Sequence, residues 1–166
     1  MKSALFALVV VFGLSPAAGV AQSKPAPSKP APSKPAAKPA LLAVYKTPTC
    51  GCCSKWVEHM KQNGFTVHVT DLNDLSSIKS KHGVPSKVQS CHTAVINGYV
   101  VEGHVPAADV KRLLKELPAV AGIAVPGMPT GSPGMEGPPN IVPPPYEVLS
   151  FDKNGGTRVF ARHGGR

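Results

Sequence analysis

Short apolar runs recur along the chain between residues 41 and 101. They are rich in Val, Ile, Leu and Tyr and are bounded by Pro, Gly or Asn, a pattern typical of buried β-strands. The pattern predicts four strands, at residues 41–45, 65–69, 93–96 and 99–101. Asn97-Gly98 separates the last two runs and predicts a tight hairpin turn between them.

Helical periodicity fills the gaps between these runs. After the first strand, an apolar face formed by Cys53, Trp56, Val57 and Met60 predicts a helix that ends at Asn63-Gly64. Residues 75–82 predict a short second helix, and a third begins at Pro106. The buried stripe of the third helix would consist of Val110, Leu113, Leu114 and Leu117. The resulting order of elements resembles the thioredoxin-like βαβαββα order of α/β domains.

Proline and glycine dominate residues 118–145, which contain nine prolines and five glycines. This composition is too rich in both residues for a helix or a central strand. Because the segment also carries apolar side chains, we expect a Pro/Gly-rich loop that lies along the domain. Residues 146–151 and 157–161 flank an Asn-Gly-Gly turn and predict a C-terminal β-hairpin, 146–161.

The N-terminal 40 residues differ from the rest. Met1-Lys2, an apolar run at residues 4–14 and small residues before Gln22 predict a cleaved signal peptide at 1–21, and hence export to the periplasm. The run is too short for a bilayer span, which disfavours the alternative of a retained membrane anchor, and no later run is long enough to span. Residues 22–40 repeat Ser-Lys-Pro-Ala and predict a disordered, extended linker. The folded domain is therefore expected at 41–166.

The formal net charge of +9 is unevenly distributed, because five of the 18 basic residues precede residue 41. Residues 41–166 carry 13 basic and nine acidic residues, a net charge of +4. A nucleic-acid-binding domain concentrates its cations on its folded part. We therefore expect no nucleic-acid partner.

Three of the four cysteines lie in residues 47–53, which read TPTCGCC. They form a C-x-x-C pair, Cys50 and Cys53, and a C-x-C pair with Cys52. A cysteine at a strand-to-helix turn lies near unpaired N–H groups and the positive end of the helix dipole, which favours its thiolate. Cys50 is thus the expected nucleophile or metal thiolate. Haem attachment is excluded because Ser54, not His, follows Cys53.

The fourth cysteine, Cys91, is followed by His92 directly before the third predicted strand. In thioredoxin-like domains the loop at this place faces the cysteine turn and usually carries a cis proline. Replacing that proline disfavours disulfide exchange on protein substrates. A thiolate and an imidazole at this place, beside three other cysteines, suit Cu(I) or zinc.

Residues 45–160 resemble the CopG-like proteins of bacterial copper-resistance systems, a family long catalogued as a domain of unknown function. The matching segments are residues 46–53, 90–93, 101–106, 125–129 and 131–136. The resemblance implies a periplasmic thioredoxin-like fold that binds copper through Cys50, Cys52, Cys53 and Cys91, with a copper-linked redox role. His92, His104, Met128 and Met135 match motif positions and are further ligand candidates. Copper ions and other periplasmic copper-resistance proteins are the expected partners.

Three functions stay open at this point. In the first, the protein sequesters Cu(I), and its imidazoles also tolerate Cu(II), so that redox conversion is possible. In the second, it is a thiol-disulfide oxidoreductase with Cys50 as the attacking and Cys53 as the resolving thiol. In the third, it is a structural zinc domain. Two purely structural disulfides are disfavoured, because three of the cysteines lie within four residues.

Other residues have simpler roles. Met60 is expected in the core. His59, His68 and His82 are expected at the surface, and His104 either caps the third helix or supports a metal ligand. Met128 and Met135 are as readily explained by packing against the domain as by binding Cu(I).

Overall fold

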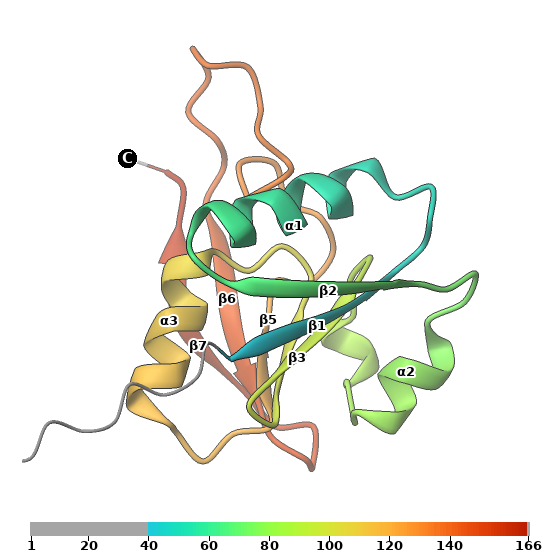
Figure 1. Cartoon of the computed structure of the whole chain (residues 1–166). Helices are drawn as coiled ribbons and strands as arrows, with labels where there is room; N and C mark the ends of the chain where they lie inside the picture. The colour runs from blue at the N-terminus through green and yellow to red at the C-terminus, as the bar shows by residue number, and fades with distance from the viewer. Residues whose placement is uncertain (1–39, 166) are drawn as a thin grey trace, which may run out of the picture. The chain divides into compact units, whose positions relative to one another are not determined.

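The computed structural model describes residues 40–165 and shows a mixed α/β fold with one seven-stranded sheet and three α-helices (Figure 1). The elements are β1 (Leu41–Lys46), α1 (Gly51–Gln62), β2 (Thr66–Asp71), α2 (Ser76–Lys81), a 3-10 turn (Ser86–Val88), β3 (Thr93–Ile96), β4 (Tyr99–Glu102), α3 (Ala107–Glu116), β5 (Gly122–Ala124), β6 (Tyr146–Phe151) and β7 (Thr157–His163). The four strands and three helices expected before residue 118, and the C-terminal hairpin, are present.

The expected signal peptide, 1–21, and all but the last residue of the expected linker, 22–40, lie outside the described residues. Among residues 40–165, none of the helices has the length and apolar character that crossing a membrane requires.

The strands follow the order β2-β1-β3-β4-β5-β6-β7 across the sheet. β1 pairs with β2 in parallel and with β3 in antiparallel orientation, and Tyr45 lies opposite Thr93. β4 pairs with β5 in parallel, whereas β3–β4, β5–β6 and β6–β7 are antiparallel. This register places the end of β1, which leads to the cysteine segment, beside the start of β3, which follows Cys91.

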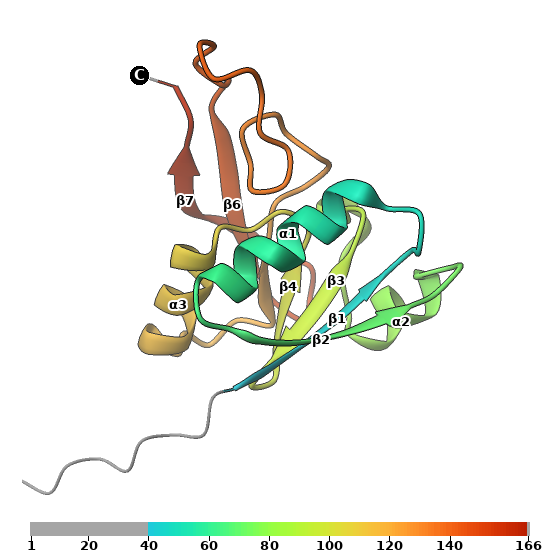
Figure 2. The same ribbon diagram turned by 45° about the horizontal axis from the view of Figure 1, so that its top comes forward.

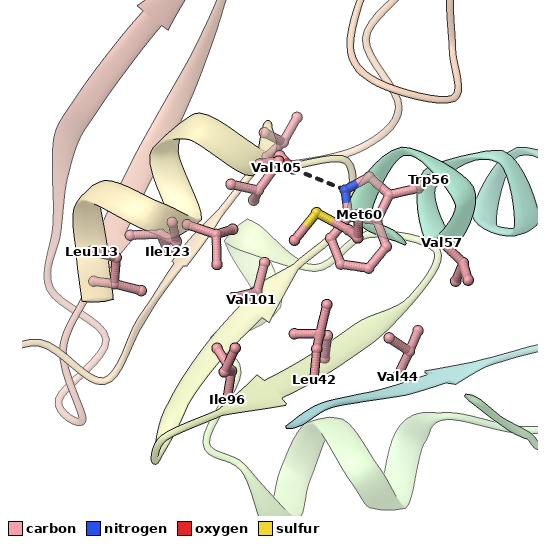
Figure 3. Close-up of a cluster of buried hydrophobic side chains, with 14 of the residues drawn as sticks. Leu42, Val44, Trp56, Val57, Met60, Ile96, Val101, Val105, Leu113 and Ile123 are labelled. Carbon is pink, nitrogen blue, oxygen red and sulfur yellow. Dashed lines mark hydrogen bonds between the residues drawn. The ribbon is translucent and has the colours of Figure 1, made fainter. Parts of the chain in front are cut away.

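Both faces of the sheet carry a buried cluster of apolar side chains. Successive residues of a strand point to opposite faces, so one strand can contribute to both clusters. Figures 1 and 2 show α1 crossing in front of the strands with α3 beside it. Val101 of β4 and Ile123 of β5 lie on the face that α1 and α3 cover, in the same buried cluster as Trp56 and Met60 of α1 (Figure 3). Their neighbours in the strands belong to a smaller cluster on the other face, whose buried members are Val84, Val88, Val100, Ala124 and Phe151.

The expectation of an uninterrupted loop over residues 118–145 is wrong at its beginning, where β5 lies in the middle of the sheet. The three residues of β5 contain no proline, and Ile123 and Ala124 are fully buried. Gly122 permits the close packing, because an added Cβ would lie 2.9 Å from Cζ of Phe151 and closer still to the Val100 carbonyl oxygen. A three-residue strand between prolines is too short for sequence periodicity to detect.

Two details of α3 also differ from expectation. Pro106 precedes the helix as its N-cap in extended conformation instead of forming its first residue. Leu117, expected in the buried stripe, adopts a left-handed conformation that ends the helix and is 62% exposed. His59 of α1 contacts the N-terminus of α3, where its Nε2 accepts a hydrogen bond from the Ala107 N–H at 3.1 Å. His59 therefore joins α1 to α3, and its expected role as an ordinary surface histidine is wrong.

This contact predicts a pH dependence of stability. Burial lowers the pKa of His59 below its ordinary 6.5, so the folded chain binds this proton less readily than the unfolded chain. The stabilisation from His59 is therefore fully present above about pH 6.5 and is lost as the pH falls through the lowered pKa. His59→Gln keeps an acceptor near Ala107 that does not titrate. Urea unfolding at about pH 7.5 and about pH 5 should show a smaller acid loss in this variant than in the unaltered chain.

The matched control is His68→Gln, since His68 is exposed on β2. It should lose the same stability on acidification as the unaltered chain. Equal acid losses in the His59→Gln and His68→Gln variants would contradict this role of His59.

Candidate metal centre

The four cysteines meet where α1 begins. Cys50 is the N-cap of α1, and Cys52 and Cys53 lie in its first turn. The Cys50 N–H donates to the Thr47 carbonyl at 3.2 Å, which closes the turn between β1 and α1. Cys91 arrives from the segment between the 3-10 turn and β3, beside the end of β1.

The sulfur atoms of this group all lie within 4.8 Å of one another. Cys50 and Cys53 form a disulfide, and Cys52 and Cys91 are free. The Sγ of Cys52 is 3.5 Å from that of Cys50, and the Sγ of Cys53 is 3.8 Å from the Cys91 carbonyl oxygen. The structure thus brings together all four cysteines that the sequence singled out.

Cys91 also belongs to a second group, with His92 and His104, whose candidate ligand atoms lie within 4.8 Å of one another. Its Sγ is 3.0 Å from Nε2 of His104 and 3.4 Å from Nδ1 of His92. Nδ1 of His104 lies 2.8 Å from the Pro133 carbonyl oxygen and can only donate to it, so Nε2 is the free acceptor nitrogen that faces Cys91. His104 therefore does not cap α3, which is the other role that the sequence left open for it.

Burial keeps this second group uncharged at neutral pH. It raises the pKa of the Cys91 thiol to about 11. It also lowers the pKa of His92 well below 6.5, with the neighbouring His104 and Lys79 acting in the same direction, and lowers that of His104. A thiol and two neutral imidazoles are thus in contact, and a bound metal ion would replace the thiol proton.

The two methionines lie in segments that border the cysteines. Met128 is 51% exposed and follows Gly127, whose carbonyl accepts a hydrogen bond from the Ser90 hydroxyl. Met135 is half-buried and follows Gly134. An added Cβ at Gly134 would lie 2.6 Å from the Cys52 carbonyl oxygen and 2.9 Å from the Trp56 amide nitrogen, so this segment packs directly on α1. Ligation by either methionine stays a prediction.

The donors fit a soft metal ion. Thiolate and imidazole groups are the ligands that Cu(I) and Zn(II) prefer, and the His104 ring is oriented as metal-binding histidines are, with its other nitrogen bonded to a carbonyl. The disulfide removes two of the thiolates until it is reduced.

The sequence did not predict the buried ion pair of Lys79 and Glu102, which lies next to the segment that carries Cys91 and His92. Glu102 is fully buried, and its carboxylate accepts hydrogen bonds from the Lys79 ammonium, from the Ser90 N–H at 2.7 Å and from the Thr93 hydroxyl at 2.7 Å. Burial raises the pKa of Glu102, while these donors act in the opposite direction. Because Ser90 and Thr93 flank Cys91 and His92, the carboxylate holds both ends of the segment that carries them.

An α/β domain that gathers cysteines and buried imidazoles at one end of its sheet belongs to the class of candidate thiolate and imidazole metal-binding proteins. Comparisons with known proteins show to which family within this class the chain is similar. A family model described as a protein of unknown function, DUF411, matches residues 88–135. No curated protein sequence matches the chain.

Two similar solved structures are titled copper resistance protein CopG, forms 1 and 2. Form 1 is 44% identical with a TM-score of 0.71, and the alignment covers 77% of this chain and 100% of that chain. Form 2 is also 44% identical with a TM-score of 0.70, and the alignment covers 76% and 99%. The chain belongs to the family of the copper resistance protein CopG.

The buried ion pair generates a prediction. Glu102→Ala leaves the Lys79 ammonium buried without its partner and should lower the free energy of unfolding by about 3–5 kcal/mol. The control Glu58→Ala removes an exposed pair with Lys61 and should cost less than about 1 kcal/mol. Chemical denaturation measures both. Similar small losses in the two variants would contradict a supporting role for Glu102.

Proposed function

We propose that the protein is an exported copper-binding protein that sequesters Cu(I) through the thiolates of Cys50, Cys52, Cys53 and Cys91. The observation that carries this proposal is the convergence of four sulfur atoms within 4.8 Å of one another, in a chain of the CopG family. Soft sulfur ligands select Cu(I) over harder cations. The copper is cargo, and its capture protects the compartment from free copper.

Binding at all four sulfurs requires the reduced protein, because the Cys50–Cys53 disulfide must open to supply two more thiolates. His92 and His104 adjoin the sulfur group through Cys91 and are further ligands in this proposal. Imidazole also tolerates Cu(II), so a mixed site can hold both oxidation states and could support copper-linked redox activity. Met128 and Met135 are thioether donors at the border of the site.

The cellular setting forms part of the proposal. Residues 1–21 would direct export, 22–40 would tether the domain, and 41–166 would bind copper in the periplasm. The titles of the two similar structures assign those proteins to copper resistance, which supports this setting. Other periplasmic copper-resistance proteins would then deliver or accept the metal.

A thiol-disulfide oxidoreductase is the second candidate function. The Cys50–Cys53 disulfide at the start of α1, and an order of elements like that of thioredoxin up to α3, favour it. Cys50 would attack and Cys53 would resolve the mixed disulfide. Cys91-His92 at the place of the usual cis proline disfavours protein substrates. A structural zinc domain is a third candidate and requires that the protein unfolds when metal is removed.

Anaerobic titration of the reduced full chain with Cu(I) against a competing chelator tests the proposal. The chain should bind one or more Cu(I), and Cys91→Ser should weaken binding by about a hundredfold, because Cys91 is shared by both ligand groups. A stoichiometry above one would indicate a cluster. His68→Gln, which alters an exposed imidazole, is the control and should bind as the unaltered chain does.

Weak binding that ignores Cys91→Ser would contradict the copper proposal. If the metal-free chain then reduces insulin or glutathione disulfide, the oxidoreductase function holds. Cooperative unfolding on treatment with a zinc chelator would instead support the structural zinc domain.

A further inference from the structure

A hollow of about 570 Å³ opens beside the smaller apolar cluster and shares no residue with the candidate metal centre. Four segments that are separate in the sequence form its wall: the end of α2, the β3–β4 turn with the start of β4, the residues that lead into β5, and the turn between β6 and β7. Its volume lies within the range of about 300–1,000 Å³ that small-molecule sites occupy. Neither copper binding nor thiol chemistry accounts for this hollow.

The rim of the hollow carries cations and, among the described residues, no acidic side chain. Lys81 is the last residue of α2, Lys153 lies in the β6–β7 turn, and both are exposed. Neither takes part in an ion pair within the described part of the chain, whereas Lys79 is buried in its pair with Glu102. The two exposed ammonium groups are therefore available to an anion that enters from solvent.

The backbone that carries both cations is held by hydrogen bonds. Oδ1 of Asp152 accepts from the N–H groups of Asn154 at 2.8 Å and Gly156 at 2.9 Å, which fixes the turn of Lys153. The N–H of Gly83 donates to the Ser80 carbonyl at 3.0 Å and closes the end of α2. An anion would thus meet two cations on a preformed frame.

The floor of the hollow is apolar side chain and bare backbone. Val100 is 4% exposed, and Val120 and Ala121 are half-buried. Gly83 and Gly98 face open space, because an added Cβ at either position would meet no atom within 4 Å. An apolar group can therefore lie over the valines while its charged end reaches the lysines.

His82 adds a polar group to the wall. Its ring lies near that of Tyr45, with centroids 6.3 Å apart, and its Nε2 has no hydrogen-bond partner among the described residues. Burial lowers the pKa of His82, and the charge of Lys81 acts in the same direction, so the ring is uncharged at neutral pH. A bound anion would oppose the effect of Lys81, which makes this ring a local reporter of binding.

We propose that the hollow binds a small organic dianion, a phosphomonoester or a dicarboxylate, whose charge is held by Lys81 and Lys153 and whose carbon body lies on Val100 and Val120. Lysine binds such groups as a point charge, and a phosphomonoester carries about two negative charges at neutral pH. A metal ion does not suit the hollow, which offers it two cations and, in the described part of the chain, no carboxylate or thiolate. This proposal is independent of the proposed copper-binding function.

An NMR titration of the full chain with phenyl phosphate and with phthalate tests the site. Inorganic phosphate is the comparison ligand, because it carries the charge without the carbon body. At least one aromatic probe should bind saturably, and about threefold or more tightly than inorganic phosphate, since its ring buries apolar surface over the valines. The amide signals of Gly83 and Gly98 and the ring signals of His82 should shift. The tighter aromatic probe identifies the natural ligand as a phosphomonoester or a dicarboxylate.

Variants of the two lysines test the origin of the affinity. Lys81→Gln and Lys153→Gln should each weaken binding of the tighter probe by about threefold to fivefold, as expected for a charge contact at an exposed site. The matched control is Lys115→Gln, which removes an exposed cation of α3, on the helix layer that covers the other face of the sheet. It should leave binding unchanged. The circular dichroism spectrum of each variant checks its fold.

Three outcomes would overturn the proposal. Equal weakening by Lys115→Gln, or equal affinity for inorganic phosphate and the aromatic probes, would show only a general attraction of anions to a basic chain. Shifts confined to residues outside the hollow would place the binding elsewhere. No saturable binding of either aromatic probe would leave the hollow without a ligand of this class. None of these outcomes bears on the copper proposal, whose donors lie outside the hollow.

Discussion

Trp56 is the side chain on which both the core and the candidate site depend. It is fully buried, packs among the apolar residues of α1, α3 and the sheet, and donates from Nε1 to the Val105 carbonyl at 2.8 Å (Figure 3). Its ring also packs against that of His92, with the ring centroids 4.4 Å apart and the ring planes tilted by 44°. An aromatic contact of this kind contributes about 1 kcal/mol beyond burial, and the hydrogen bond contributes about another 1 kcal/mol. One residue thereby fixes the first turn of α1, which carries Cys52 and Cys53, against the segments that carry Cys91 and His104.

Much of the site could be predicted from the sequence because its signals are local. The spacing of Cys50, Cys52 and Cys53 and their place between a strand and a helix are legible in seven consecutive residues. Asn97-Gly98 fixes the β3–β4 hairpin, and the hairpin sets how far Cys91 lies from Glu102 and His104 along the paired strands. The second ligand group was therefore within reach of sequence reasoning, although its geometry was not.

The parts that sequence reasoning missed depend on contacts between distant segments. Lys79 lies on a short helix and Glu102 ends a strand, and no periodicity links two residues 23 positions apart. Glu102, an acidic residue at the end of the apolar run of β4, was the available signal of this ion pair, since a buried charge requires a partner. His59 has the polar surroundings of a surface residue, and only the packing of α1 beside α3 reveals its bond to Ala107. β5 owes its position to pairing with β4 and β6 and not to its own three residues.

The sheet continues past β4 through β5, β6 and β7, so the two segments that border the candidate site rest on different supports. β4 lies between two hydrogen-bonded neighbours, and the backbone that leads to His104 is therefore held on both sides. Residues 127–135 are held instead by turns, by the bridge between Gly127 and Ser90, by the bond between the Pro133 carbonyl and His104, and by the packing of Gly134 on α1. Strand pairing thus sets the position of His104, whereas the position of Met135 depends on contacts with the residues of the site itself.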